Sequence, residues 1–148
     1  MDKNIFREYD IRGIYNDEIT RETAYTLGRS FGSYISLSGE TSTVIGHDNR
    51  LSSPSLTNNL IKGITDTGID VIGLGLCTTP MYYYTCIKLS VFSGVMVTAS
   101  HNPKDDNGFK FAFDENGNCK GQEIQDFYDE LVKGEFVKGE GRIYKYSI

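Results

Sequence analysis

The chain has 148 residues, of which 24% are charged and 39% hydrophobic, and its formal net charge is −5 at pH 7. This length suits one globular domain with a single core. The acidic balance argues against a nucleic-acid partner, which needs a basic field, and no apolar run approaches the roughly 20 residues of a membrane-spanning helix.

The amino-terminal third predicts a helix followed by a short strand. Residues 20–35 carry apolar side chains at helical spacing, and Thr20 suits the N-cap position. Residues 43–46 form an apolar stretch that predicts a buried strand. The polar run from His47 to Arg50 follows directly. This run is therefore expected at the carboxyl end of the strand.

A second helix and a second strand come next. The helix is expected to begin at Ser52 or Ser53, to carry Pro54 in its first turn and to end at Gly68. A serine hydroxyl can accept a hydrogen bond from the free N–H groups of the first turn, where proline is also tolerated. Residues 69–76 then show an apolar pattern interrupted by glycines, which predicts a strand.

The rest of the chain continues this alternation of strands and helices. Residues 78–84 predict a short helix, and residues 94–97 predict a third strand. Residues 109–113 alternate in the manner of a strand, and residues 124–131 predict the last helix. The tail from Lys133 to Ile148 is rich in glycine and charge and resembles the start of a linker.

This order of elements predicts an α/β fold with a parallel sheet at its centre. Strands that alternate with helices are joined by right-handed crossovers, which make neighbouring strands parallel. In such sheets ligands bind outside the carboxyl ends of the strands. Two polar segments are expected at these ends, one at residues 47–50 and one directly after Val97.

The cysteines and the amino terminus bear on the cellular location. Cys77, Cys86 and Cys119 lack CxxC spacing, which argues against a disulfide framework or a zinc site. We interpret them as free thiols in a reducing compartment. The opening segment MDKNIFREYD has no apolar signal-peptide core, so a cytoplasmic location is predicted.

The stretch VTASHNPKDDNGFKF, residues 97–111, has three interpretations. The first is a polar loop, in which Asn102-Pro103 and Asn107-Gly108 are turn dipeptides. The second is a hydrolase with Ser100 activated by His101. Adjacent residues on an extended backbone point to opposite sides, however, and no GxSxG elbow is present.

The third interpretation is phosphoryl chemistry on Ser100. A phosphoserine carries about −1.5 to −2 charges at neutral pH and needs donors and cations nearby. His101, Lys110 and Arg12 are the candidates for that role. Phosphoryl transfer depends mostly on positioning and charge neutralisation, which a polar loop at a rigid strand end can supply. The sequence has neither a Walker A loop nor GxGxxG, so nothing indicates a nucleotide site.

Three segments resemble motifs of the α-D-phosphohexomutases. TASHNPKDDNGFK (98–110) resembles the phosphoserine loop, the segment at 6–13 resembles the YDIRG motif, and the segment at 46–53 resembles GxDxRLSS. YDIRG is typical of the phosphomannomutase/phosphoglucomutase branch and favours hexose over glucosamine substrates. The resemblance implies that residues 1–148 are domain I, a three-layer α/β/α unit with a mixed, mostly parallel sheet of about four strands.

The resemblance also implies roles for individual residues. Ser100 would carry the phosphoryl group, pass it to a hexose phosphate and recover it from a 1,6-bisphosphate intermediate, which makes the enzyme an isomerase of carbohydrate metabolism. His101 and Lys110 would contact phosphate or assist proton transfer, while Arg12 and Tyr9 would face the substrate. The alternatives are a solvated Lys110 and, for Arg12, a structural salt bridge with Asp10 or Asp48.

Four other polar residues are expected to be structural. Asp48 and Arg50 are predicted to hold the loop at the end of the first strand together. Asn102 is predicted to shape its turn through side-chain to backbone hydrogen bonds. His47 has no partner in view in the sequence and is treated as structural.

The resemblance further implies magnesium, bound to Ser100 through its phosphate oxygen and to three aspartates of a DGDGDR-type loop, with glucose 1,6-bisphosphate as activator. This sequence lacks that loop and the sugar- and phosphate-binding loops of the later domains. The chain is therefore expected to need the remaining mutase domains, with Lys133 onward leading into an interdomain linker, and to be largely inactive alone. A non-catalytic module that binds a phosphosugar or a partner, and one half of a split mutase, are the alternatives.

Overall fold

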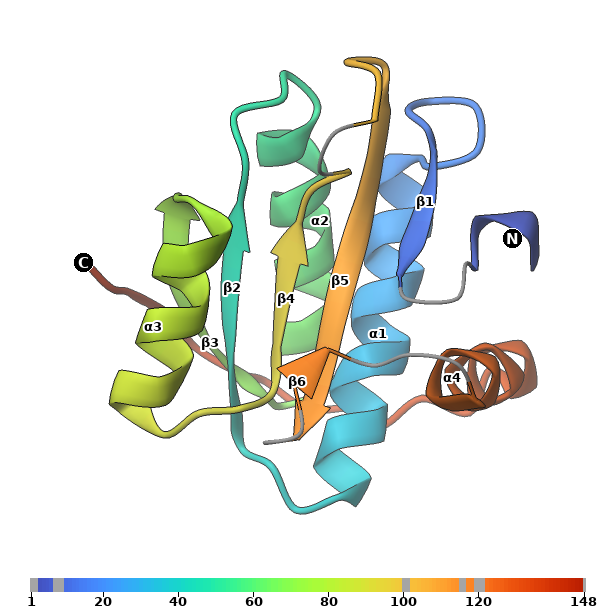
Figure 1. Ribbon diagram of the computed structural model, residues 1–148. Helices are drawn as coiled ribbons and strands as arrows, with labels where there is room; N and C mark the ends of the chain where they lie inside the picture. Colours follow the sequence, from blue (N-terminus) through green and yellow to red (C-terminus); the bar gives the residue numbers. More distant parts are fainter. Residues whose placement is uncertain (1–2, 7–9, 100–101, 115–116, 119–121, 148) are drawn as a thin grey trace.

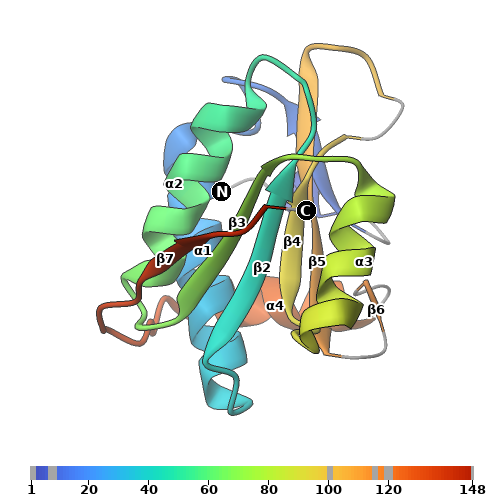
Figure 2. The same cartoon turned by 90° about the vertical axis from the view of Figure 1, so that its left-hand side faces the viewer.

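The computed structural model shows a central sheet with helices on both faces (Figures 1 and 2). It describes residues 3–6, 10–99, 102–114, 117–118 and 122–147. Within these ranges, one face is covered by α1 (Arg21–Leu37), α2 (Ser53–Thr65) and α4 (Gln122–Lys133), and the other by α3 (Thr79–Leu89). The predicted α/β class and its three layers are confirmed.

The sheet contains seven strands among the described residues, rather than about four. β6 (Gly117–Asn118) pairs with β5, and the remaining order is β1 (Ile11–Ile14), β5 (Asp106–Asp114), β4 (Gly94–Val97), β2 (Ser42–His47), β3 (Asp70–Leu76) and β7 (Ile143–Lys145). β4, β2, β3 and β7 are parallel, whereas β5 is antiparallel to β4, β1 and β6. β1, β6 and β7 escaped prediction because such short strands show no clear periodicity.

The main core lies between the sheet and α1, α2 and α4. Phe109, Phe111 and Phe113 alternate along β5, so all three point toward these helices. The ring of Phe111 lies 5.2 Å from that of Phe31 in α1 and 5.1 Å from that of Phe127 in α4, measured between ring centroids. Burying each ring contributes about 2 kcal/mol. This cluster therefore anchors β5, which lies between β1 and β4.

α1 and α2 meet at a pair of glycines. A Cβ atom on Gly28 would collide with the carbonyl oxygen of Leu60, and one on Gly63 would collide with the carbonyl oxygen of Tyr25. The two helix backbones are thus too close for any side chain to fit between them. This contact holds α2 against α1 and sets where its amino-terminal end lies.

The helices follow the sequence signals with changes in α2 and α3. α2 ends at Thr65, before the predicted stop at Gly68, and no side-chain hydrogen bond from Ser52 caps its start. Thr20 caps α1 as predicted, because its hydroxyl accepts a hydrogen bond from the N–H of Thr23. α3 continues to Leu89, beyond its predicted end at Tyr84, and closes on Ser90 in a left-handed conformation. In the part of the chain that the structure describes, no helix is long and apolar enough to cross a membrane.

The carboxyl-terminal tail is more ordered than its composition predicts. The sequence suggests a linker from Lys133 onward, but the N–H groups of Gly139 and Gly141 donate to the carbonyls of Asp66 and Thr65. β7 then pairs in parallel with β3, at the edge of the sheet. Backbone pairing of this kind carries no side-chain pattern, so it could not be read from the sequence.

Candidate functional site

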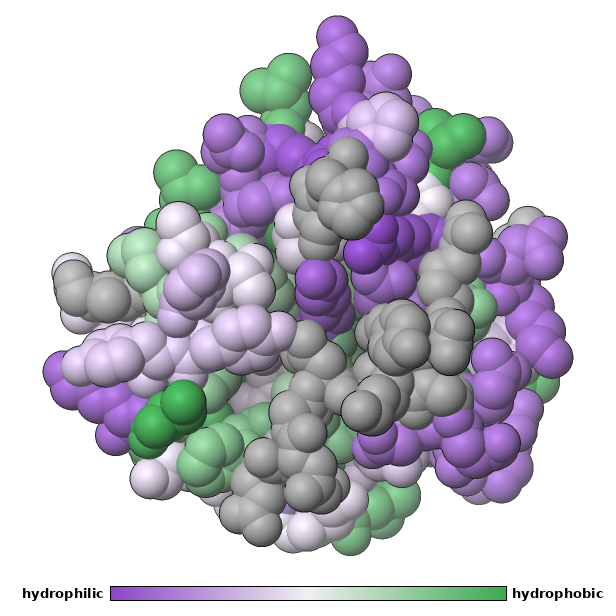
Figure 3. Space-filling model, in the orientation of Figure 1, coloured by the Kyte–Doolittle hydropathy of each residue, from purple (hydrophilic) through white to green (hydrophobic). Residues whose placement is uncertain are grey.

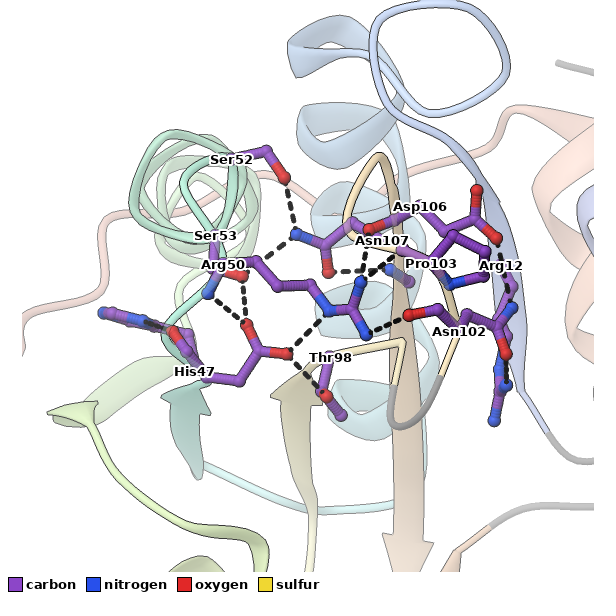
Figure 4. A network of polar contacts seen from close by, with 12 residues as sticks. Arg12, His47, Arg50, Ser52, Ser53, Thr98, Asn102, Pro103, Asp106 and Asn107 are labelled. Atoms are coloured by element: carbon purple, nitrogen blue, oxygen red, sulfur yellow. Dashed lines mark hydrogen bonds and ion pairs between the residues drawn. The ribbon is translucent and has the colours of Figure 1, made fainter.

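Two polar segments meet at the carboxyl ends of β2 and β4. These strands are parallel neighbours, with His47 opposite Val97 at their ends. The segment that follows β2 leads into α2, and the segment that follows β4 leads into β5. Together with Asp10 and Arg12, their side chains form a connected set of hydrogen bonds, which Figure 4 shows apart from Asp10. We call this set the strand-end network; it comprises Asp10, Arg12, Asp48, Arg50, Ser52, Ser53, Thr98, Asn102, Asp106 and Asn107.

Asp48 joins the ends of both strands to the start of α2. Its carboxylate accepts hydrogen bonds from Ser53 Oγ at 2.5 Å and from Thr98 Oγ1 at 2.7 Å. The backbone N–H and the Nε of Arg50 donate to the same carboxylate, each at 3.1 Å. The carboxylate is thus surrounded by donors, and it ties β2, β4 and α2 to one point.

Arg50 holds the segment that follows β4. Its guanidinium donates to three backbone carbonyls, at 2.9 Å to Asn102, 2.6 Å to Pro103 and 3.2 Å to Asp106. The side chain is only 11% exposed, and its planar group suits several acceptors at once. The sequence-based prediction that Asp48 and Arg50 hold the loop together is confirmed.

Arg12 belongs to the same network through Asn102. Its Nε donates to Asp10 at 2.6 Å and its terminal nitrogen donates to Asn102 Oδ1 at 2.7 Å. The amide of Asn102 in turn donates to the carboxylate of Asp106 at 3.2 Å. Within the described residues, the side chain of Asn102 bonds the side chains of Arg12 and Asp106, and the predicted side-chain to backbone bond is not among these contacts. Of the two salt bridges considered for Arg12, the structure contains the one with Asp10.

Asn107 is a structural residue that sequence reasoning missed. Its side chain is fully buried, and its amide nitrogen donates to the hydroxyls of Ser52 at 2.8 Å and Ser53 at 2.9 Å. Its own oxygen accepts from the N–H of Gly108. The sequence suggested a turn dipeptide, but both residues lie within β5. Only their burial against α2 distinguishes this Asn-Gly pair from an ordinary turn.

The candidate nucleophile Ser100 lies outside the described residues, as do His101 and Tyr9. The residues that flank Ser100 and His101 are nevertheless placed. Ala99 is fully buried, and its carbonyl accepts a hydrogen bond from the N–H of Asn102 at 3.1 Å. The N–H of Thr98 donates to the carbonyl of Gly108 at 2.9 Å. The segment that carries Ser100 is therefore held at both of its ends.

Lys110 lies on β5, directly opposite Met96 of β4. Met96 packs in the small core under α3, so alternation along the strands places Lys110 on the side of the sheet that α3 covers. Arg12 pairs with Gly108, two residues before Lys110, and thus lies on that same face. No described residue forms a hydrogen bond or an ion pair with the half-buried ammonium of Lys110.

A cavity of about 1060 Å³ lies beside the network. This volume is large enough for a phosphorylated sugar. Its described lining combines polar and apolar side chains: Ile14, Tyr15, Asp48, Asn49, Arg50, Leu51, Ser52, Thr79, Thr98, Asn102, Lys104 and Asp105. Ile14, Tyr15 and Thr79 were missed from the sequence because they lie outside the three motifs, at the end of β1, directly after it and at the start of α3.

His47, Cys77 and Cys86 have surroundings that indicate structural roles. His47, for which the sequence suggested no partner, makes a hydrogen bond through Nδ1 with the carbonyl oxygen of Asp48 at 2.8 Å. Cys77 and Cys86 are buried free thiols, and burial raises the pKa of Cys86 to about 11. Within the described ranges, no group of three or more His, Cys, Asp or Glu side chains could hold a metal ion.

Comparisons with known proteins agree with this arrangement. A family model described as phosphoglucomutase/phosphomannomutase, alpha/beta/alpha domain I, matches residues 3–138. A phosphomannomutase/phosphoglucomutase of Pseudomonas aeruginosa is 41% identical over 145 residues, which are 98% of this chain and 31% of the relative. A phosphoglucomutase of Neisseria gonorrhoeae is 39% identical over 135 residues, which are 91% of this chain and 29% of the relative.

The solved structures give the same result at the level of the fold. A phosphoglucomutase/phosphomannomutase family protein from Burkholderia thailandensis matches with a TM-score of 0.92 and 34% identity, over 99% of this chain and 34% of that one. The chain spans about a third of the length of the relatives that it matches. Both the sequence and the fold therefore show that the chain belongs to the phosphoglucomutase/phosphomannomutase family, in which it matches domain I.

Proposed function

We propose that this chain is the first, phosphoserine-bearing domain of an enzyme that interconverts hexose 6-phosphates and hexose 1-phosphates. In the first half-reaction the bond between phosphorus and the Ser100 oxygen breaks, and a bond from phosphorus to a free sugar hydroxyl forms as that hydroxyl loses its proton. In the second half-reaction a bond between phosphorus and a sugar oxygen breaks, that oxygen regains a proton, and the bond to the Ser100 oxygen forms again. The resulting 1,6-bisphosphate returns its other phosphoryl group to Ser100. Glucose 1,6-bisphosphate would accordingly restore an enzyme that has lost its phosphate.

The observation that carries this proposal is the anchored segment between Ala99 and Asn102. Asp48 and Arg50 fix its surroundings, because Asp48 accepts a hydrogen bond from Thr98 and Arg50 donates to the carbonyls of Asn102 and Pro103. Phosphoryl transfer needs a donor held in a constant position, because positioning supplies much of the rate. Ser100 follows a buried residue at the end of a central strand, which suits that need.

Two cations on the side of the sheet that α3 covers support the proposed phosphoryl transfer. Lys110 makes no hydrogen bond or ion pair with any described residue, so its ammonium is available to a phosphate. Arg12 is held by Asp10 and Asn102, which aligns its guanidinium next to the same segment. The proposal gives both residues a role in neutralising phosphate charge. By resemblance it assigns proton transfer or phosphate contact to His101 and substrate contact to Tyr9.

Magnesium enters the proposal only through the complete enzyme. The carboxylates near the site are already engaged, since Asp48 accepts from four donors and Asp106 accepts from Asn102. The described part of this chain thus offers no ligand cluster of its own. A metal that assisted the reaction would reach this domain at the phosphate on Ser100, with its protein ligands supplied by later domains.

The chain alone is proposed to have little or no mutase activity, because it spans about a third of its relatives. A non-catalytic phosphosugar-binding module and one half of a split mutase are the competing proposals. The size of the native polypeptide separates them, as measured by mass spectrometry of cytoplasmic extract. A chain about three times longer supports the first proposal, and a chain that ends near Ile148 favours the competitors.

The test of the function is a serine substitution in that native polypeptide. Ser100→Ala should abolish both mutase turnover and the phosphate mass on the peptide that contains residue 100. Ser38→Ala is the matched control, because Ser38 is exposed at the far end of α1. Assays with glucose and mannose phosphates would determine the preferred sugar. Full activity of Ser100→Ala would remove Ser100 from the mechanism.

A further inference from the structure

An apolar surface covers the outer side of α3. Ile87 is 68% exposed, Leu76 65% and Tyr84 58%, and Met81 and Tyr83 are partly exposed beside them. We call these five residues the α3 face. In Figure 3 the area over α3 is pale and green, whereas the area over α4 is mostly purple. Contiguous apolar surface of this kind is rare on a domain that has no partner.

The sequence of α3 shows why this surface cannot be explained by packing within the domain. The helix reads TPMYYYTCIKL and carries a single charge, on Lys88. Its inner side already buries Tyr82, Thr85 and Cys86. The helix is therefore apolar on both sides, which is typical of a helix buried between two layers. Among the described residues it packs against one such layer, the sheet (Figure 2).

The end of the chain lies next to this helix. β7 runs parallel to β3, and the N–H of Tyr146 donates to the carbonyl of Gly73 at 2.9 Å. The chain thus heads toward Leu76, the last residue of β3 and part of the α3 face. Figures 1 and 2 both place the carboxyl-terminal end beside α3. A segment that continued from here would begin within reach of the exposed side chains.

We propose that the α3 face is the docking surface for the domain that follows this one in the complete polypeptide. The inference rests on the proposed function, in which this chain is the first domain of a longer mutase. The relatives are about three times longer than the chain, so their remaining domains provide the covering layer. The docked domain would then cover α3 on its outer side, as the sheet does on its inner side.

Hydroxyl-radical footprinting of side chains tests this proposal directly. The 148-residue chain and the native polypeptide that contains it are oxidised in parallel, and modified peptides are measured by mass spectrometry. Met81, Tyr84 and Ile87 should react severalfold more slowly in the native polypeptide. Leu37 is the internal control, because it is 80% exposed on α1, on the opposite face of the sheet. Equal oxidation of the α3 face in both samples would overturn the proposal.

A pair of variants provides a second readout. Ile87→Asp should leave the thermal unfolding of the isolated chain unchanged, because the side chain is already in water. In the native polypeptide it should lower the unfolding temperature or split the transition, since the aspartate would be buried at the domain contact. Leu37→Asp should have little effect in either protein. An unchanged transition for Ile87→Asp in the native polypeptide would contradict docking on α3.

The other possible occupants give distinct results. In the isolated chain, protection of the α3 face from oxidation could increase with protein concentration and be abolished by Ile87→Asp. That result would assign the face to a second copy of the chain and overturn the proposal. A native polypeptide that ends near Ile148 would also overturn it. Mutase activity of the same sample separates this inference from the function. An active polypeptide with an unprotected α3 face refutes docking alone, and an inactive one with a protected face refutes the function alone.

Discussion

At the carboxyl ends of β2 and β4 the charged side chains find their partners within the domain, whereas on α3 the apolar side chains point away from it. Asp48 and Arg50 together contact two strands, one helix and the segment on either side of residues 100–101. Tyr84 and Ile87 contribute little to the fold that the structure describes. The first region is complete in this chain, and the second needs something outside it.

This difference separates two requirements of a multidomain enzyme. A reactive group must be held rigidly before substrate binds, so the contacts that hold it belong in the same domain. A contact between two domains is stabilised by apolar side chains that become buried when the domains pack. The same side chains are unfavourable when they are exposed to water.

The largest loss of stability is expected for Asp48→Ala. The substitution removes the acceptor of Ser53 and Thr98 and leaves the largely buried guanidinium of Arg50 without its carboxylate. We expect the free energy of unfolding to fall by about 3 kcal/mol, measured by circular dichroism in urea. Lys62→Ala, in the exposed pair with Asp66, is the control and should cause no measurable change. If the two variants gave the same urea unfolding curve, the network would not stabilise the domain.

Asn107→Ala should have the next largest effect. Its fully buried amide donates to the hydroxyls of Ser52 and Ser53 and accepts from the buried N–H of Gly108, and the substitution removes all three hydrogen bonds. The expected loss is about 2 kcal/mol in the same assay. Asn59→Ala is the matched control, because the side chain of Asn59 only bonds its own helix, and its effect should stay within about 0.5 kcal/mol. A loss as small as that of the control would mean that water replaces the buried contacts.

The inner side of α3 should make the domain sensitive to alkaline pH. Burial raises the pKa of Cys86 from 9.0 to about 11, so the thiol ionises in the unfolded chain before it does in the folded one. The unfolded state then binds fewer protons, and stability falls as the pH rises from 9 to about 11. The loss should amount to about 1–2 kcal/mol. Cys86→Ala should make the free energy of unfolding depend less steeply on pH in this range. An equally steep dependence would show that other groups, such as Tyr82, cause it.

The smallest effect is expected on the outer side of α3. In the isolated chain Ile87→Asp should change the free energy of unfolding by no more than about 0.5 kcal/mol, because the side chain is mostly exposed. Urea titration of the isolated chain measures this. A loss of several kcal/mol would show that Ile87 packs within this domain, and it would remove the contrast between the two regions.

Much of the fold was predictable because local patterns coincide with it. The spacing of apolar residues identified α1, α2 and α4, the Thr and Pro residues at its start identified α3, and Thr20 was correctly predicted as the cap of α1. The polar segments after β2 and β4 were predicted to lie at the sheet's carboxyl edge, and the parallel pairing of these strands confirms it. Periodicity and capping depend on residues close in the sequence, which is why they can be read from it.

The exceptions all involve residues that are distant in the sequence. Arg12 meets Asn102 only because β1 pairs with β5, and Asn107 meets Ser52 and Ser53 only because α2 is seated on α1. The tail pairs with β3 through its backbone, which no side-chain pattern announces. The motif around Ser100 could be recognised in advance, but the partners that hold its flanks could not.

By itself the sequence determined which residue types follow the two central strands: an acid and an arginine after β2, and the motif that contains Ser100 after β4. Only the tertiary structure decided that Asp48 and Arg50 clamp the segment around residues 100–101, that Arg12 pairs with Asp10, and that one face of α3 is left uncovered. The physical reason is that residue types set which bonds are possible, whereas the pairing of distant strands and helices selects which of them form.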